Sequence, residues 1–437
     1  MGYYVKNMAI DISDGSEIKF GDFPTQDSFH LKKYYIDAFR GQCIVGYWLM
    51  EQVYKSRPMG QQYPYEYTIA NDSISEGLGS PKKDFFTGAK CHPDGFPIII
   101  TWINSKTNVE TLMGVYAWNL KKSKEVYNCD KKKAENIILD GAINNSTLFG
   151  GKINWTQFEI RNPKSLIDID GNKYNGDNPK ELSETDALSK KVKDYLTTLS
   201  GVVSALAASN TKETFEKFFM PNPFIDYWLV SQITYNHDGF SKNWIWVSYD
   251  GKHFMPTLYD VDSIFGMHYA GIFIIKDSEK SIVGDSAVFG LTSLYAEEIA
   301  ARYSELRNLG IFTAENIVGL LEKWINQIGY DNMKKDLELY SETPSYRDSY
   351  LNEGWICVGD GWGVADAYDA SRTYSAGDRC KYLSYVFEAT KEMVGVTPIS
   401  KTYDKNPNVA GFYNSPKRVY NWLVKKIESL DKLYNYK

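Results

Sequence analysis

Residues 233–266 read ITYNHDGFSKNWIWVSYDGKHFMPTLYDVDSIFG, an aromatic hairpin pattern bounded on both sides by acidic and amide residues. Asp238 and Asn243 precede the hairpin, and Asp260 and Asp262 follow it. Asp and Asn are common turn formers, so ordinary turn chemistry accounts for each of them singly. They also carry the hard oxygen ligands that Mg²⁺ takes from proteins. The stretch therefore leaves two readings open, simple turns or a site for a metal and a phosphate.

The spacing of these residues is similar to that of a kinase catalytic loop, but by itself it favours turns, because DG and DxD pairs are common in turns. In protein kinases an Asp that accepts the substrate hydroxyl proton is followed five residues later by a metal-binding Asn, as Asp238 is followed by Asn243. Asp260 or Asp262 would then take the place of the metal-binding Asp that kinases present after the next hairpin. The local residues differ from a protein kinase, because His237 stands where kinases have Arg and Phe240 where they have Lys.

Composition excludes several classes of protein. The 437 residues are 43% hydrophobic and 24% charged, as in a soluble globular protein with two or three domains. The net charge of −6 and the lack of a long basic stripe predict that nucleic acid is not a partner. Five Cys without CxxC spacing disfavour a zinc site and a disulfide framework. With no signal-peptide pattern and no run long enough for a membrane span, we expect a soluble protein, either virion-associated or cytoplasmic.

The order of the predicted elements indicates an α+β fold. Strand-like segments dominate the first part of the chain, and helical segments follow between residues 188 and 339. Residues 353–410 change to short strand-like pieces rich in Gly and aromatics. The closing helix then carries an apolar stripe that should pack back onto the main domain, formed by Val419, Trp422, Leu423, Ile427, Leu430 and Leu433. We therefore expect a main domain over 1–352, a small all-β insert over 353–410, and a closing helix over 411–437.

The chain resembles the CotH family, the spore-coat atypical kinases and their bacterial and phage relatives. The family core is a hydrophobic helix, DGFxxN, an aromatic hairpin and (W/Y)DxDxxFG, and it is matched by FIDYWLVSQITYNHDGF and the residues that follow to Gly266. Further matches in the same order are VKN at Val5, DSFHLKKYYID at Asp27, GFPI at Gly95, MGVYAWNLKK at Met113, EIRNPKSL at Glu159 and the closing PKRVYNWLVKKIESLDKLY.

The resemblance implies a distant protein-kinase-like, two-lobe fold that transfers the ATP γ-phosphate to Ser or Thr hydroxyls of a protein substrate with Mg²⁺ or Mn²⁺. Asp238 would orient the hydroxyl, Asn243 and Asp260 would bind the metal, and Asp262 would be a supporting or alternative ligand. The nucleotide-binding residues implied in the same way are Lys6 or Lys33 for the phosphates, Glu51 as the ion-pair partner of that lysine, and Arg161 as a steadying residue. Turn, strand-surface and helix-surface roles are the structural alternatives for each of them.

Two departures from the family pattern favour a different function. The Gly/Ser-rich phosphate cradle that precedes VKN in the family has no counterpart in MGYYVKN, so we expect it to be absent or truncated. Asn119 and Leu120 stand where many relatives carry Glu after the GxY strand. The alternative is a catalytically weak or inactive phage virion or cell-surface protein that keeps a CotH-like scaffold for attachment.

The expected insert could supply that attachment. Residues 368–398 resemble small chitin-binding-type carbohydrate modules, with the match carried by Tyr374, Gly377, Asp378, Phe387, Ala389 and Pro398. Sugar rings stack on flat aromatic faces, so the candidate glycan-binding residues are Trp355, Trp362, Tyr382 and Tyr385. A β module of this size also needs aromatic residues for its own core, so each of these four has packing as its alternative role.

Overall fold

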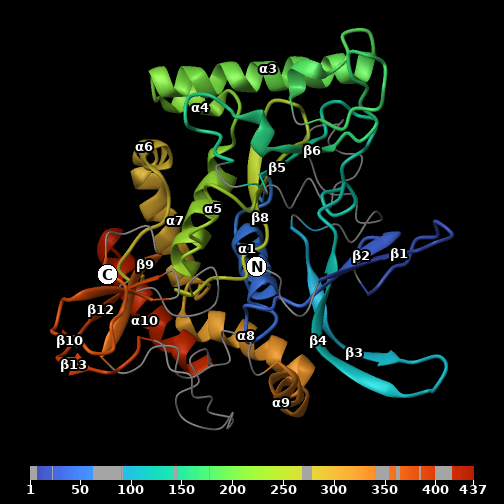
Figure 1. The fold of residues 1–437 in the computed structure, drawn as a ribbon. Helices are drawn as coiled ribbons and strands as arrows, with labels where there is room; N and C mark the ends of the chain where they lie inside the picture. Colours follow the sequence, from blue (N-terminus) through green and yellow to red (C-terminus); the bar gives the residue numbers. More distant parts are fainter. Residues whose placement is uncertain are drawn as a thin grey trace.

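The computed structural model describes residues 7–21, 23–62, 90, 92–141, 143, 146–176, 178–267, 278–340, 354–360, 365–382, 385–398 and 416–437. Helices and β-sheets both contribute, which confirms the α+β prediction. Figure 1 shows helices α1 and α5 at the centre, the sheet that contains β5 and β6 above α1, the sheet of β1–β4 on the right, and the small strands β9–β13 at the lower left.

The first sheet is antiparallel, with the strand order β1-β2-β4-β3. Its strands are Met8–Asp11 (β1), Ser28–Lys32 (β2), Gly95–Ile103 (β3) and Glu110–Leu120 (β4). Helix α1 (Gln42–Lys55) follows β2, and apolar residues of α1 share one core cluster with Val115 and Ala117 of β4. Phe29 of β2 belongs to a separate cluster with Leu120. Successive residues of a strand point to opposite faces, so each strand of this sheet contributes to two environments.

The second sheet holds the aromatic hairpin of the opening stretch. Its order is β6-β5-β7-β8, with Ile137–Gly141 (β5), Glu159–Asn162 (β6), Trp244–Ser248 (β7) and Phe254–Leu258 (β8). Every residue of β5, β7 and β8 is buried. The indole rings of Trp244 and Trp246 pack edge to face against each other at 5.0 Å, and both contact the ring of Phe149. This packing fixes both ends of the hairpin, where the acidic residues lie.

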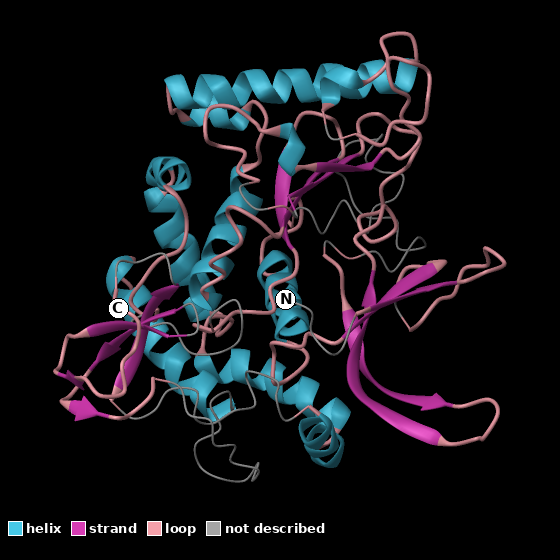
Figure 2. Ribbon diagram, viewed as in Figure 1, coloured by secondary structure: helices cyan, strands magenta, loops and turns pink. Residues whose placement is uncertain are grey.

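Helices form the rest of the main body (Figure 2). They are α3 (Ala187–Ala208), α4 (Lys212–Glu216), α5 (Pro221–Thr234), α6 (Ser286–Leu294), α7 (Ala296–Asn308), α8 (Ala314–Ile328) and α9 (Tyr330–Leu339), with short 3-10 turns at Trp155–Gln157 (η1) and Pro179–Glu181 (η2). The single helix predicted over residues 313–339 is broken at Gly329, whose φ of 82° lies in the left-handed region. Within the described residues, no helix is both long and apolar enough to cross a membrane.

Residues 354–398 contain a small β unit with its own core. The three-stranded order is β11-β12-β9, and β10 pairs with β13. The strands are Trp355–Asp360 (β9), Thr373–Tyr374 (β10), Arg379–Tyr382 (β11), Tyr385–Ala389 (β12) and Met393–Val394 (β13). Helix α10 (Pro416–Leu433) packs on α8 and α5. Five residues of its predicted stripe are buried, but Leu433, in the last turn, is 49% exposed.

Candidate functional site

Asp238 lies in a tight turn between α5 and β7. Helix α5 ends at a left-handed residue, Tyr235 (φ 56°), and the backbone carbonyl of Asp238 accepts hydrogen bonds from the amides of Ser241 and Lys242 at 3.1 and 2.8 Å. Gly239 is required here, because a Cβ at this position would approach Nδ2 of Asn236 to 2.2 Å. The turn leaves the Asp238 carboxylate 32% exposed, next to the ring of His237.

The second acidic segment is tied to the first by backbone contacts. Asn243 and Asp260 both have positive φ, 56° and 50°, a conformation that Asn and Asp tolerate better than most residues. Nδ2 of Asn243 donates to the backbone carbonyl of Asp260 at 3.4 Å. The Asp260 amide donates to Oη of Tyr47 on α1 at 3.1 Å, and the Phe265 amide donates to the carbonyl of Thr234 at 2.7 Å. The two ends of the hairpin and helix α1 thus meet at Asp260.

The carboxylates at this point influence one another. Burial raises the pKa of the Asp262 carboxyl well above its ordinary range, and the negative charges of Asp260, Asp37 and Asp238 raise it further. Asp37 is largely compensated, because its carboxylate accepts hydrogen bonds from the Gly41 and Gln42 amides, each at 2.7 Å, at the start of α1. Asp260 and Asp262 have no such backbone donors among the described contacts.

Lys32 is the cation nearest to these acids. Its Nζ lies 3.6 Å from Oδ1 of Asp260, and both side chains are partly buried, with 15% and 31% exposure. Burial is the largest influence on the pKa of Lys32 and would lower it, but the charges of Asp260 and Asp262 and the hydrogen bond to Asp260 act together with other neighbours to outweigh burial, so the net shift is upward. Lys32 is therefore held in its charged form beside the acids.

A second basic group lies next to Lys32. The carboxylate of buried Asp140, in β5, accepts from Nζ of Lys122 at 2.5 Å and from Nε of Arg161 at 2.8 Å, and its Oδ1 has no hydrogen-bond partner. Burial, and after it the positive charges of Lys32, Lys121, Lys122 and Arg161, together lower the pKa of His30 to about 4. These side chains therefore form one cationic group around β2, β4 and β6, which we call the basic wall (Lys32, Lys121, Lys122 and Arg161).

The structure separates Lys33 from this site. The Nζ of Lys33 forms an ion pair with buried Asp336 and donates to the carbonyl of Val115 at 2.9 Å, while the ring of Tyr340 lies 4.0 Å from it. Asp336 also accepts from Nε of Arg40 at 2.9 Å. Because side chains alternate along β2 and its continuation, Lys32 faces Asp260 and Lys33 faces α9. Among the described residues, Lys33 forms no ion pair with the acids after β8, and Lys32 pairs with Asp260 instead.

Glu51 pairs with two lysines among the described residues, neither of which is Lys33. It lies in α1 and forms ion pairs with Lys55 and with Lys90, the latter at 3.6 Å between Nζ and Oε2, and not with Lys33. Arg161 is near the site as expected, although its contacts are to Asp140 and Glu159. Lys6 lies outside the described residues.

The candidate glycan platform is only partly visible. Trp355 is 3% exposed and its Nε1 donates to the carbonyl of Val396 at 2.9 Å, so it belongs to the core of the β unit. Tyr382 is half-buried against the ring of Tyr368. Trp362 and the side chain of Tyr385 lie outside the described residues. The prediction of a surface aromatic is therefore wrong for Trp355.

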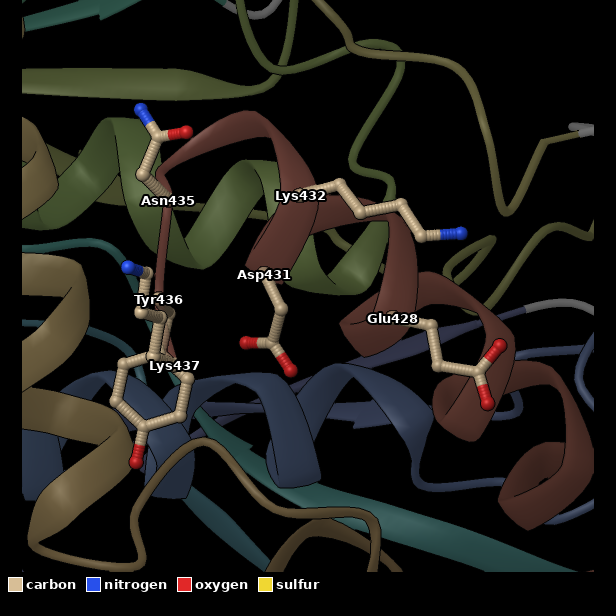
Figure 3. Close-up of a pocket in the computed structure, with 6 residues that line it drawn as sticks. All are labelled: Glu428, Asp431, Lys432, Asn435, Tyr436 and Lys437. Atoms are coloured by element: carbon tan, nitrogen blue, oxygen red, sulfur yellow. The ribbon is translucent and has the colours of Figure 1, made fainter.

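A hollow of about 530 Å³ lies at the end of α10 (Figure 3). It is lined by Glu428, Asp431, Lys432, Asn435, Tyr436 and Lys437. The Asp431 carboxylate is already engaged by Oη of Tyr303 at 2.8 Å and by Nε of Arg307 at 3.0 Å. This hollow contains none of the residues predicted from the sequence, and its charged groups balance one another.

Several residues of the site were missed by sequence reasoning. Strand alternation offered a signal for Lys32, since one of two adjacent lysines must point away from the other. Asp140 and Tyr47 belong to no recognisable motif, and Lys122 ends the matched stretch MGVYAWNLKK without any signal of its role, so only the fold brings these residues to Asp260. Within the described residues, no group of three or more His, Cys, Asp or Glu side chains could hold a metal by itself.

Comparison with known proteins adds no assignment: no protein-family model matches the chain, and no curated protein matches it significantly.

Proposed function

We propose that the chain is a CotH-like atypical Ser/Thr protein kinase, which transfers the γ-phosphate of ATP to a protein hydroxyl with Mg²⁺ or Mn²⁺. The observation that carries the proposal is the charge imbalance at the end of β8. Asp260 and Asp262 interact repulsively, and the nearest ion-pair partner described for either of them is Lys32, at 3.6 Å. Such an arrangement costs stability unless something positive binds there, and a divalent cation would relieve it.

The residues present suit a metal that is shared with phosphates. Mg²⁺ is commonly bound through one or two carboxylates while substrate phosphates and waters complete its shell, so a cluster of three acids is not required. Asp260 and Asp262 would hold the cation, with Asn243 beside them. When bound, the cation would neutralise charge on the transferred phosphoryl group.

The protein side chains have separate parts to perform. Asp238 is partly exposed and near enough to Asp262 to affect its pKa, so it is placed to accept the proton of an incoming hydroxyl. The basic wall offers ammonium and guanidinium groups to the phosphate oxygens. Lys32, already charged beside Asp260, is the first candidate for the α- and β-phosphates.

The kinase-like, two-lobe interpretation of the fold is supported by the order of its parts. The first sheet and α1 come before the hairpin, Asp238 and Asp260 lie at the two ends of the β7–β8 hairpin, and helices α6 to α9 follow. The β unit between α9 and α10 is interpreted as an insert because α10 packs back on α8 and α5. The attachment alternative has less support, since Trp355 is part of a core.

The direct test is transfer of label from γ-labelled ATP to the chain itself and to a generic Ser/Thr protein substrate, with Mg²⁺ or Mn²⁺. We expect label with the wild type, and at least about a 100-fold lower rate for Asp238→Ala and Asp260→Ala. Asp194→Ala is the matched control, because Asp194 is an exposed carboxylate on α3 paired only with Lys190. Equal labelling by all four proteins, or none by the wild type, would refute the proposal.

A further inference from the structure

A second hollow lies between α1, α8 and the start of β3, and its lining shares no residue with the acidic site. Its volume is about 520 Å³, within the range of pockets that bind small ligands and peptide side chains. Four aromatic residues line it, Phe20, Phe23, Trp48 and Phe96, and all four are only half-buried. None of the residues of the candidate nucleotide site lines this hollow, which we call the aromatic pocket.

The aromatic walls are held in place by their neighbours. The rings of Phe23 and Phe96 are nearly parallel, at 11° and a centroid distance of 5.9 Å, and Phe96 also stacks on Trp118. Nε1 of Trp48 donates to Oδ1 of Asp94 at 3.1 Å, which fixes the indole. Half-exposed rings that are fixed around a hollow retain apolar surface that a ligand can cover, without the cost of ordering the walls.

The polar residues of the pocket favour an anionic ligand. Lys90, Lys323 and Asp94 line it, and because Lys90 already forms ion pairs with Asp94 and Glu51, each at 3.6 Å, the cation that remains for a ligand is Lys323. Nζ of Lys323 lies over the face of Trp48, 4.7 Å from the ring centroid. No carboxylate among the described residues forms an ion pair with Lys323. Gln327, one turn further along α8, offers an amide at the same rim.

The position at β3 favours an extended peptide over a compact small molecule. Gly95 and Phe96, the first residues of β3, line the pocket, and β3 is an edge strand of the described sheet. A peptide anchored by one side chain in a pocket at the end of an edge strand can continue along that strand through main-chain hydrogen bonds. Aromatic side chains are the usual anchors of such complexes.

We propose that the aromatic pocket is a docking site for an acidic peptide segment of a partner protein, in which one aromatic side chain enters between Phe23, Phe96 and Trp48 and a neighbouring carboxylate contacts Lys323. This site is independent of phosphotransfer and would remain if the chain had no kinase activity.

The test is binding of the fluorescein-labelled peptide Glu-Asp-Phe-Asp-Glu to the full chain, followed by fluorescence anisotropy. Two control peptides separate the contributions: one has Ser in place of Phe, and the other has Lys in place of each acid. We expect the first peptide to bind at least about tenfold more tightly than either control, the ratio that one anchor or one ion contact of modest strength provides. Equal binding of all three peptides, or none of the first, would overturn the proposal.

Variants locate the binding. Lys323→Glu should weaken the acidic peptide about tenfold or more, and Lys334→Glu, an equally exposed lysine on α9 with the same charge change, should alter it less than about twofold. Both sites are exposed, so the fold should survive each change. Undiminished binding by Lys323→Glu would place the peptide elsewhere. Self-association of the free chain in sedimentation, abolished by Lys323→Glu, would assign the pocket to a second copy and also overturn the proposal.

Discussion

Two acidic positions in this molecule are built in opposite ways. Asp226, in α5, is completely buried, and its two oxygens are bound by Arg57 (2.6 and 2.9 Å) and Arg302 (2.9 Å). Asp260 and Asp262 lie close to each other, and the ion-pair partner described for them is Lys32. The first arrangement is complete within the chain, so it serves the fold. The second arrangement leaves negative charge uncompensated, which is typical of binding sites rather than of structural ion pairs.

The largest loss of stability should follow from substitution of Asp226, the carboxylate that is fully paired within the chain. Asp226→Ala leaves two buried guanidinium groups without their carboxylate, and such losses cost about 3–5 kcal/mol. Arg302 also holds the end of α1 through Oγ of Ser56, so α1, α5 and α7 should loosen together. Urea unfolding measures the change, with Asp194→Ala expected to stay within about 0.5 kcal/mol. A loss for Asp226→Ala below about 1 kcal/mol would contradict the structural role assigned to Asp226.

The adjacent lysines give the same contrast on one strand. Lys33→Met removes a buried cation from Asp336, and because Arg40 still binds that carboxylate we expect a loss of about 2–3 kcal/mol in the free energy of unfolding. Lys32→Met should cost less than about 1 kcal/mol but reduce phosphotransfer at least about tenfold, the effect of one contact of about 1.4 kcal/mol.

The two variants are each other's controls, with stability from denaturation and transfer from labelled ATP. If Lys33→Met lowered phosphotransfer more than Lys32→Met while the chain stayed stable, the assignment of Lys32 as the phosphate-binding lysine would be wrong.

This pair also shows what the sequence could provide. The α+β class, the hairpin, helix α5 and the closeness of Asp238, Asn243, Asp260 and Asp262 follow from local patterns of turn residues and apolar periodicity. The choice between Lys32 and Lys33 depends on the register and face of β2, which tertiary packing against α1 and α9 decides. Asp140 and Lys122 reach the site through β5 and β4, and no local signal connects those strands to Asp260. Nearly all of helix α5 is buried, because helices and sheet surround it.

Substitution of Asp262 should change the stability of the fold in the opposite direction to substitution of Asp226. Asp262→Asn removes one of two repelling carboxylates from a buried place, so in metal-free buffer at pH 7.5 we expect the chain to become more stable, by about 1 kcal/mol. The same variant should lose phosphotransfer. Thermal unfolding and label transfer on one preparation measure both, and destabilisation by Asp262→Asn would mean that the carboxylate has a structural partner.

The smallest effect is expected at the tip of the β7–β8 hairpin. His253 Nδ1 lies 2.6 Å from Oδ2 of Asp250, and this hydrogen bond raises the pKa of His253. Burial raises the pKa of the Asp250 carboxyl, but the same bond, together with hydrogen bonds from the His253 and Lys252 amides, outweighs burial and lowers this pKa to about 2. The raised histidine stabilises the fold below its unfolded pKa of about 6.5 and loses this contribution as pH rises through the folded value. The lowered carboxylate contributes above about pH 4 and loses its contribution as pH falls towards 2.

The pair of His253 and Asp250 therefore adds most to the stability of the fold between about pH 4 and pH 6.5. His253→Asn should lower Tm more at pH 5 than at pH 8, by a small amount because both side chains are partly exposed. An equal change in Tm at the two pH values would show that the ion pair is not formed in solution.

The most direct test of the central claim, that the acids after β8 are built to bind a metal and a nucleotide, is thermal unfolding with Mn²⁺ and a non-hydrolysable ATP analogue. Ligand at about 100 times its dissociation constant stabilises a protein by about 2.7 kcal/mol, so the wild type should gain at least about 2 °C in Tm. Asp260→Asn should gain nothing, and Asp194→Asn should gain as much as the wild type. The account is contradicted if the wild type shows no gain, or if Asp260→Asn gains as much as the wild type.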